Sequence, residues 1–397
     1  MTNFFAPVER GVQHAALRAA NRRAVMTTIS FNPGMSNADV SRHTGLAPQT
    51  ASAIVTELED EGMILRGEVL RGRRGQPATP LYLNHNAMFA IGCEVSWHHI
   101  DIVLVSLGMR QIGHYRRDYD APDIKTVVAE CAGAIADLVD RLTPEERERF
   151  AGIGIASPMA SLEGIERPMT PSDLPLPWRD LDLRKDLAET TGFETFWFND
   201  GNAAAWTEML SNPTNSPNSF AYFFIDCSIS SGIITGDSLW GTPAYVASNL
   251  GFMRVCDSSG QQHYGHDIAS LCALSDRIGN AGLPMPNGNP MDWDWNAIAP
   301  QVDEWLDDSA QAFAELVLNA GAALGVPTVV IDGAIPRDIL ERLVSATQQK
   351  LAMKPAGPFA QPALTAGAQG QKAPALGAAV LTFSSRFYSR DASELGR

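Results

Sequence analysis

The chain has 397 residues, of which 45% are hydrophobic, so it is longer than one ordinary domain and can fill more than one packed core. Its formal net charge of −15 excludes a protein that binds nucleic acid over its whole surface, because phosphate repels acidic side chains. Residues 1–84 carry a net charge of +2 and the remaining residues a net charge of −17, so we expect any DNA contact within the first 84 residues.

The first predicted elements are two helices. Residues 17–29 have apolar side chains at helical spacing and predict a supporting helix, whose arginines either contact phosphate or form a solvated face. Ser36 is a typical N-cap for a second helix over residues 37–44, which Gly45 ends. We expect this second helix to bury one side through Ala38, Val40 and Leu46.

A third helix is predicted from Ala47 onward. Pro48 stands in its first turn, where a missing N–H group costs nothing. Its apolar face is formed by Ile54, Val55 and Leu58. Two short helices around a glycine-containing turn are typical of a helix-turn-helix, in which the first turn of the second helix enters the major groove of DNA.

A basic β-wing is predicted directly after this helix. A strand over residues 63–71, a glycine-rich turn over 72–77 and a returning strand over 81–83 form the hairpin. Its arginines would bind the DNA backbone or the adjacent minor groove without reading sequence. The alternative is a solvated hairpin beside a helical unit that binds protein.

The predicted DNA contacts come from the helix-turn-helix and from the wing. Gln49, Thr50 and Ser52 are placed at base edges, and Arg42 nearer the phosphates. The wing contributes Arg71, Arg73, Arg74 and Gln76. Residues 1–84 are therefore predicted to be a winged helix-turn-helix DNA-binding domain.

From residue 85 the pattern changes to alternating strands and helices. The first half of this region also contains a proline-rich loop over 166–178, which we expect to cross a cleft. The predicted strands are 90–95, 100–105, 111–119, 152–156 and 195–198, and the predicted helices are 125–142, 183–191 and 203–210.

The second half repeats this alternation, and residues 285–295 are expected to be irregular because they are dense in Pro, Asn, Asp and Trp. The predicted strands are 219–226, 232–235 and 328–331, and the predicted helices are 268–279, 305–324, 339–351 and 375–381. Two strand-rich α/β lobes around a cleft account for this order, so residues 85–397 are predicted to form a second, two-lobed domain.

Three motifs behind the winged helix-turn-helix carry a resemblance to a known family. They are Gly152-Ile153-Gly154-Ile155-Ala156-Ser157-Pro158, Phe198-Asn199-Asp200-Gly201-Asn202-Ala203-Ala204-Ala205 and Val329-Val330-Ile331-Asp332-Gly333. In this order they resemble the ROK family of bacterial sugar kinases and related transcriptional repressors, over nearly the whole chain. The resemblance implies an actin-like ATPase fold of two lobes, a sugar-binding cleft, and a homodimer or homotetramer that presents two DNA-binding units.

The ATP motifs of that family are not retained. Its Asp-x-Gly-x-Thr loop corresponds to Glu94-Val95-Ser96-Trp97-His98, and its Gly-Thr-Gly-Ile-Gly loop to Ser228-Ile229-Ser230-Ser231-Gly232. Side chains stand where glycines would let the backbone approach phosphate, so we expect no ATP binding and no enzyme activity. Asp200 matches the family's catalytic base, but without a phosphoryl donor it is expected only to accept hydrogen bonds. Considered by itself, Asp200 is also a typical helix N-cap.

The zinc motif of the family is changed as well. Its Glu-x-Gly-His segment corresponds to Asn249-Leu250-Gly251-Phe252, and residues 260–266, where the cysteine-rich loop should follow, contain no cysteine. A Cys2His2 set is present by residue type in Cys256, His263, His266 and Cys272. Their spacing fits no common zinc motif, so we expect no metal and no cofactor.

The cleft nevertheless keeps side chains that suit sugar hydroxyl groups. The predicted effector contacts are Asp173, Asn199, Asp200, Asn249 and Phe252, which match sugar-contacting positions of the family, and Trp178, whose ring would stack on the effector. Asn249 and Phe252 replace the family's Glu and His and bring less charge and a flat apolar surface. We therefore expect an effector that is less polar, or differently substituted, than the hexoses and amino sugars typical of the family.

The cysteines and the hydropathy pattern indicate the compartment. Five widely spaced cysteines, an odd number, argue against a disulfide framework, so reduced and mostly buried thiols are expected at Cys93, Cys131, Cys227, Cys256 and Cys272. No apolar run reaches the ~18 residues of a membrane span, and no apolar leader segment is present. We expect a cytoplasmic protein with no membrane partner.

The predicted function is a DNA-binding transcriptional regulator of the repressor type, controlled by a carbohydrate-like small-molecule effector and lacking kinase activity. Its expected partners are an inverted-repeat operator in double-stranded DNA, the effector, and further copies of the chain. One alternative is a ROK sugar kinase fused to a DNA-binding domain. Another is a DNA-binding structural protein whose second domain only dimerises. ATP turnover and effector-dependent release of DNA separate these alternatives.

Overall fold

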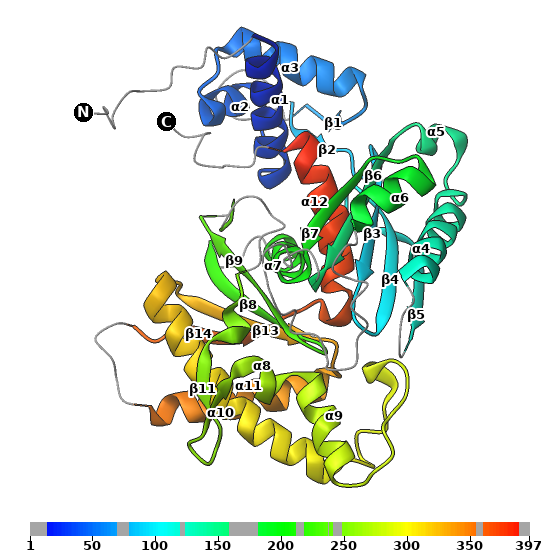
Figure 1. Ribbon diagram of the computed structural model, residues 1–397. Helices are drawn as coiled ribbons and strands as arrows, with labels where there is room; N and C mark the ends of the chain where they lie inside the picture. Colours follow the sequence, from blue (N-terminus) through cyan, green and yellow to red (C-terminus); the bar gives the residue numbers. More distant parts are fainter. Residues whose placement is uncertain are drawn as a thin grey trace, which may run out of the picture. The chain divides into compact units, whose positions relative to one another are not determined.

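The computed structural model describes residues 14–69, 79–119, 124–158, 182–211, 218–236, 238–240, 248–354 and 360–388. The chain separates into two compact units, one formed by Met1–Ala87 with Ser384–Arg397 and the other by Met88–Phe383. Within the described residues, the first unit contains three helices near the start of the chain, the end of the last helix and a two-stranded sheet, and the second contains two lobes that are each built on a five-stranded sheet (Figure 1). This is the fold class expected from the sequence.

Three helices form the core of the first unit: α1 His14–Phe31, α2 Asn37–Thr44 and α3 Pro48–Asp60. Ser36 caps α2 as predicted, because its hydroxyl accepts a hydrogen bond from the Asp39 N–H and the Asp39 carboxylate accepts one from the Ser36 N–H. Gly45 ends α2 in the left-handed region at φ 67°, which favours glycine. The buried face of α3 consists of Ala51, Ile54, Val55 and Leu58.

The first unit also differs from the prediction in two details. Ala38 is exposed while Val40 is buried, because residues two apart point about 200° apart around a helix. The wing strand β1 Ile64–Arg66 ends at Arg66 instead of continuing to residue 71. It pairs with β2 Leu81–Leu83, and the preceding Pro80 has no N–H group with which to extend the ladder.

The first lobe of the second unit has the sheet order β5-β4-β3-β6-β7. Its strands are β3 Phe89–Val95, β4 His99–Ser106, β5 Gln111–Asp118, β6 Phe150–Ser157 and β7 Thr195–Asn199. The helices α4 Ile124–Val139 and α6 Leu183–Thr191 lie together beside the sheet (Figure 1), and the short α5 Pro144–Arg147 precedes β6. Because β3, β6 and β7 are parallel, Glu94 and Asn199 lie at the same edge of the sheet.

The second lobe has the sheet order β10-β9-β8-β13-β14. Its strands are β8 Ser219–Ile225, β9 Ile229–Thr235, β10 Ser238–Leu239, β13 Thr328–Gly333 and β14 Ala363–Ala366. Its helices are α8 Gly265–Ala269, α9 Leu271–Asn280, α10 Ala299–Leu324 and α11 Arg337–Met353. A hairpin, β11 Arg254–Cys256 with β12 Gln262–Tyr264, and three short 3-10 helices, η3 Leu250–Phe252, η4 Pro290–Asp292 and η5 Gly370–Lys372, complete the lobe.

Several predicted elements of this unit have different bounds, among them α10, which begins at Ala299 instead of residue 305, and the last helix, which ends at Phe387 instead of residue 381. β9 begins at Ile229, so Ser230 and Ser231 belong to a strand and not to a loop. The helix expected over 268–279 is interrupted at Ser270, whose hydroxyl accepts from the Ala273 N–H and so caps α9. The helix expected over 203–210 is α7 Asp200–Ser211, which begins three residues earlier, directly after β7.

The helix α12 Ala373–Phe387 packs on the first lobe through a close backbone contact. A Cβ atom at Gly92 in β3 would overlap the carbonyl oxygen of Ala375 in α12, so only glycine fits there. The last residues of α12 belong to the first unit, in which the Ser30 hydroxyl donates to the Tyr388 hydroxyl oxygen at 3.3 Å.

The expectation of five reduced cysteines is wrong for one pair. Cys227, in the turn between β8 and β9, and Cys272, near the start of α9, form a disulfide although 45 residues separate them. Their Cα atoms lie 4.8 Å apart because the Leu271 N–H donates to the Asp226 carbonyl and holds the two segments together. Cys93 and Cys131 are free and buried, and Cys256 is free and half-buried.

Among the residues that the structure describes, no helix combines the length and the apolar character needed to cross a membrane.

Replacing Gly92 with Ala should reduce the free energy of unfolding by about 3 kcal/mol, because the new methyl group forces β3 and α12 apart. The matched control is Gly133→Ala, an exposed glycine inside α4 with no atom near its added Cβ, which should stabilise the protein by ~0.5 to 1 kcal/mol. Urea denaturation of both variants and of the parent protein measures these changes in the free energy of unfolding. Equal stability of Gly92→Ala and the parent protein would contradict the packing.

Candidate functional site

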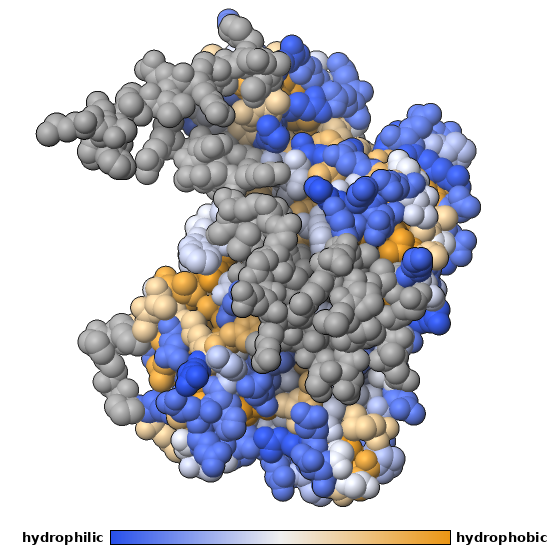
Figure 2. Space-filling view, viewed as in Figure 1, coloured by the Kyte–Doolittle hydropathy of each residue, from blue (hydrophilic) through white to orange (hydrophobic). Residues whose placement is uncertain are grey.

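The first turn of α3 presents its polar side chains to solvent. Gln49 and Thr50 are exposed and Ser52 is half-buried, and Figure 2 shows mainly hydrophilic side chains over α3. The N-cap residue Ala47 forms no side-chain capping bond. This turn therefore has the exposure that a helix needs to enter the major groove.

The C-terminal half of α3 is acidic, and arginines neutralise it. Glu57 and Glu61 are ion-paired with Arg18 and Arg22 of α1, and Glu59 with Arg66 of β1. The hydrogen bonds from Arg22 lower the pKa of Glu61. These two arginines of α1, whose role was left open, thus hold α1 to α3 and compensate carboxylates that would repel DNA.

The other predicted DNA contacts fall in two groups. Arg42 is exposed and forms an ion pair with Asp39, one turn earlier in α2. Arg71, Arg73, Arg74 and Gln76 lie outside the described residues.

Asn199 and Asp200 form a buried polar pair where β7 ends and α7 begins. The Asp200 carboxylate accepts hydrogen bonds from Asn199 Nδ2 at 2.9 Å, from the Gly201 N–H at 2.8 Å and from Ser230 Oγ at 2.6 Å. Asn199 Oδ1 in turn accepts from the Asn202 N–H, so Asn199 caps α7 instead of Asp200. Ser230 was not predicted as a site residue. Its position in the segment Ser228–Gly232, which corresponds to a phosphate loop of the family, was a signal that could have identified it.

Burial raises the pKa of Asp200 to about 6, and the negative charge of Asp226 acts in the same direction. The hydrogen bonds from Ser230 and Gly201 oppose this rise because they favour the ionised carboxylate. Asp200 is therefore a hydrogen-bond acceptor near neutral pH that gains a proton under mildly acidic conditions.

The segment 248–252 is tied to the same strand as Ser230. Ser231 Oγ is hydrogen-bonded to Ser248 Oγ at 2.8 Å and accepts from the Leu250 N–H at 3.0 Å. Asn249 is exposed, and the ring of Phe252 lies 5.7 Å from that of His266. The structure thus connects Asn199, Asp200 and the segment 248–252 through β9. The other two predicted effector contacts, Asp173 and Trp178, lie outside the described residues.

The turn after β3 touches the turn between β8 and β9. Ser96, after β3, donates from Oγ to Asp226 Oδ2 at 2.6 Å, and Asp226 follows β8. Glu94 lies behind this contact and is buried. Burial raises the pKa of Glu94 to about 7, although the neighbouring His99 lowers it. Two carboxylates, those of Glu94 and Asp226, therefore lie at this contact.

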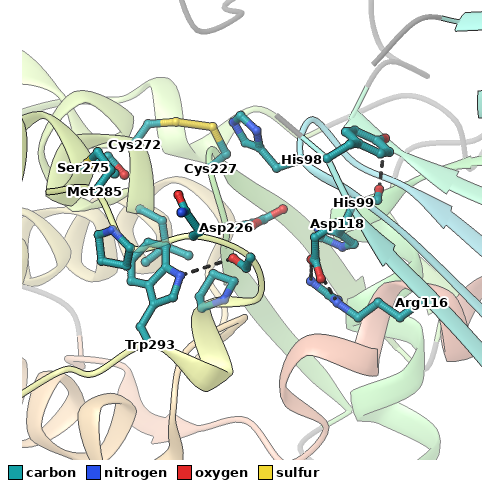
Figure 3. Close-up of a pocket in the computed structure, with 16 residues that line it drawn as sticks. His98, His99, Arg116, Asp118, Asp226, Cys227, Cys272, Ser275, Met285 and Trp293 are labelled. Carbon is teal, nitrogen blue, oxygen red and sulfur yellow. Dashed lines mark hydrogen bonds and ion pairs between the residues drawn. A yellow bond between two sulfur atoms is a disulfide. The ribbon is translucent and has the colours of Figure 1, made fainter. Parts of the chain in front are cut away.

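A cavity of about 460 Å³ opens beside this contact. Figure 3 shows the Cys227–Cys272 disulfide on one side of the cavity and the Arg116–Asp118 ion pair on the other. Among the described lining residues of this cavity, Asn199, Asp200, Asn249 and Phe252 do not occur, so the cavity is a space distinct from the Asn199–Asp200 pair.

The four residues considered for zinc have other partners or positions. Cys272 is in the disulfide, and His266 Nδ1 accepts from the Ile229 N–H at 3.3 Å. His263 faces Asp257 at 3.2 Å. Within the described part of the chain, Cys256, His263, His266 and Cys272 do not form a group with metal-binding spacing.

Comparisons with known proteins agree with these motifs. Residues 90–384 match the model of the ROK family, and residues 18–64 match that of a winged helix-turn-helix DNA-binding domain. The chain is 26% identical over 245 residues to the xylose repressor of Bacillus spizizenii, which covers 60% of this chain and 61% of the repressor. The chain thus matches about three-fifths of the length of that relative.

The similar proteins include kinases as well as regulators. The N-acetylmannosamine kinase of Vibrio vulnificus is 26% identical over 252 residues, which cover 58% of this chain and 79% of the kinase. A crystal structure of a ROK family transcriptional regulator, a homolog of the E. coli MLC protein, has a TM-score of 0.69 and 18% identity, and covers 96% of this chain and 99% of that one. This last likeness shows that the fold is shared.

The raised pKa of Asp200 predicts a pH-dependent stability. Between pH ~4 and ~6 the folded state holds the Asp200 proton more tightly than the unfolded state, so this stabilising contribution falls as pH rises and is lost above pH ~6. The unfolding free energy of Asp200→Asn minus that of the parent protein should therefore rise by about 1 kcal/mol from pH 5 to pH 7.5.

Urea denaturation at each pH measures the difference. As a second variant, Ser230→Ala removes a hydrogen bond that favours the ionised form and should move the transition to higher pH. If the difference in unfolding free energy between Asp200→Asn and the parent protein stays constant across this pH range, the pKa of Asp200 is not raised.

Proposed function

We propose that the protein is a sugar-responsive DNA-binding repressor without sugar kinase activity. The premise is that the chain belongs to the ROK family and carries an N-terminal winged helix-turn-helix. The relatives support this proposal, since they include xylose repressors.

The observation that carries the proposal is the contact between the Ser96 hydroxyl and the Asp226 carboxylate. In this position a kinase needs a cradle of backbone N–H groups around phosphate. Here a carboxylate occupies the turn, and the buried Glu94 lies close to it. A triphosphate would meet negative charge and would have to break the contact, so ATP binding is disfavoured.

The second candidate is a ROK sugar kinase that also binds DNA. It is favoured by one observation, the retention of Asp200 at the position of the family's catalytic base, hydrogen-bonded and buried. A buried carboxylate that accepts three hydrogen bonds serves equally well to bind a sugar hydroxyl without transferring phosphate. Direct measurement of ATP turnover separates the two candidates.

The DNA-binding surface of the proposal is the exposed first turn of α3, together with the basic wing. Gln49 and Thr50 read bases there, Ser52 and Arg42 support the contact, and the wing arginines supply affinity that depends on salt. Two copies of the chain in a symmetric dimer or tetramer present two such surfaces, so the operator is an inverted repeat.

The effector of the proposal is a sugar held beside Asn199 and Asp200, with Asn249 and Phe252 on the adjoining segment. The xylose repressors among the relatives make a pentose the first candidate. A pentose also suits the replacement of the family's Glu and His by Asn249 and Phe252, because it has fewer hydroxyl groups than a hexose and needs fewer charged partners.

Removing the side chains of Gln49 or Thr50 should weaken specific DNA binding about 5- to 150-fold, the equivalent of ~1 to 3 kcal/mol for one lost base contact. The measurement is fluorescence anisotropy with a duplex selected from a random-sequence library. The control is His85→Ala, an exposed residue beyond the end of β2, which should leave the affinity unchanged. Equal affinities of all three variants and the parent protein would exclude the first turn of α3 as the reading element.

Xylose at millimolar concentration should release the parent protein from this duplex, while Asp200→Ala should require about 5- to 150-fold more sugar, because a buried hydroxyl left without its partner costs ~1 to 3 kcal/mol. Asp140→Ala, which removes an exposed carboxylate, is the matched control and should respond like the parent protein. Sugar phosphate formed from ATP and lost in Asp200→Asn would overturn the proposal in favour of the kinase.

A further inference from the structure

Three side chains at the junction of the two lobes have the residue types and the spacing of a metal site. Glu94 lies in β3, His99 begins β4, and Asp226 follows β8. One potential ligand atom from each of them lies within 4.8 Å of the other two. We propose that Glu94, His99 and Asp226 bind one divalent first-row transition-metal cation, such as Mn²⁺ or Zn²⁺.

The strongest support is an unsatisfied buried carboxylate. Glu94 is 1% exposed and His99 is 3% exposed. Neither Glu94 Oε2 nor His99 Nε2 has a hydrogen-bond partner among the described residues, and His99 Nε2 lies 3.5 Å from Glu94 Oε1. A buried polar atom without a partner is costly, and a cation between these atoms would remove that cost.

A protonated His99 alone does not account for the cluster. It would face Glu94 Oε1 and leave Oε2 of the same carboxylate unpaired. The nearby Arg116 already pairs with Asp101 and Asp118, which leaves Glu94 and Asp226 without a guanidinium partner among the described residues. Two carboxylates facing one imidazole therefore carry an excess of negative charge, which a divalent cation compensates.

The surroundings hold the three ligands in place. Ser96 donates to Asp226 Oδ2 and leaves the other carboxylate oxygen of Asp226 for a cation. The Tyr119 hydroxyl donates to the carbonyl oxygens of Ser96, at 2.7 Å, and of His99, at 3.1 Å, so it fixes the turn between β3 and β4. Hydrogen bonds of this kind fix the positions of the residues that bind the metal and so favour one arrangement of ligands around it.

The cavity supplies both access and vacant coordination positions. His99 and Asp226 belong to its wall, so an ion can enter from solvent and keep water on its open side (Figure 3). Two carboxylates and one imidazole suit Mn²⁺, Fe²⁺, Co²⁺ and Zn²⁺ better than the soft ions that prefer thiolates. Ligand distances of ~2.0 to 2.2 Å require the three ligand atoms, which lie within 4.8 Å of one another, to move closer together around the ion.

Because two ligands come from the first lobe and one from the second, the bound ion would join the lobes at the place where the family's kinases hold ATP phosphates. The inference does not depend on the proposed function. Metal binding is measured on the purified full chain without DNA or sugar, so its failure would leave the repressor proposal intact.

The experiment is an isothermal titration calorimetry measurement at pH 8, in which MnCl2 or ZnCl2 is added to the full chain after treatment with a chelator. One ion should bind per chain, and Glu94→Gln and Asp226→Asn should each weaken binding by at least about tenfold, with His99→Asn doing the same. Circular dichroism identifies a variant that does not fold, and the other two then carry the test. If both ions fail to bind to the folded parent protein, the proposal is overturned.

The matched control is His98→Asn, which changes the neighbouring histidine. His98 lies near the sulfur atoms of Cys227 and Cys272 and belongs to a different group of potential ligands. The proposal expects His98→Asn to bind the ion like the parent protein. Loss of binding in His98→Asn but not in His99→Asn would assign the ion to the group that contains His98 and overturn the proposal.

Discussion

The junction of the two lobes depends on one backbone contact, the approach of α7 to β9 at Gly201. A Cβ atom at this position would overlap the backbone nitrogen of Ser231, so helix and strand come closer than a larger residue permits. The residues immediately before the contact, Asp200 and Ser230, are thereby held with their side-chain oxygens 2.6 Å apart. Backbone packing, and not a flexible side-chain contact, therefore sets the position of the Asp200 carboxylate. Since α7 follows the first lobe and β9 belongs to the second, the same contact joins the lobes.

The junction between the lobes gathers the carboxylates of Glu94, Asp200 and Asp226. Burial raises the pKa of Glu94 to about 7 and that of Asp200 to about 6, and Asp226 contributes to both rises. A junction that disfavours its own carboxylate charges also disfavours a triphosphate. A neutral sugar or a cation meets no such penalty there. The similar proteins include both kinases and regulators, and under the proposed function the side chains at the turns after β3 and β8 disfavour ATP.

The sequence predicted the parts of the fold that depend on local pattern. The helices of the first unit follow from apolar spacing, the Ser36 cap and the Gly45 turn, and the strands of both lobes from continuous apolar runs. Contacts between distant segments could not be predicted from the sequence. Cys227 and Cys272 are separated by 45 residues, and no motif around either cysteine indicates that they form a disulfide. The position of Asp200 was predicted because its motif is contiguous, whereas its partner Ser230 and the group of Glu94, His99 and Asp226 are assembled by the tertiary fold.

The hydrogen bond between Ser30 and Tyr388 has a consequence for synthesis on the ribosome. The two residues are 358 positions apart and belong to the same unit, so α1 is made long before the end of α12. The first unit thus acquires its last internal contact only when the whole second unit has been translated. Contacts that span so much of the chain form late in folding. A nascent chain that stalls within the second unit therefore exposes a first unit that still lacks the contact between Ser30 and Tyr388.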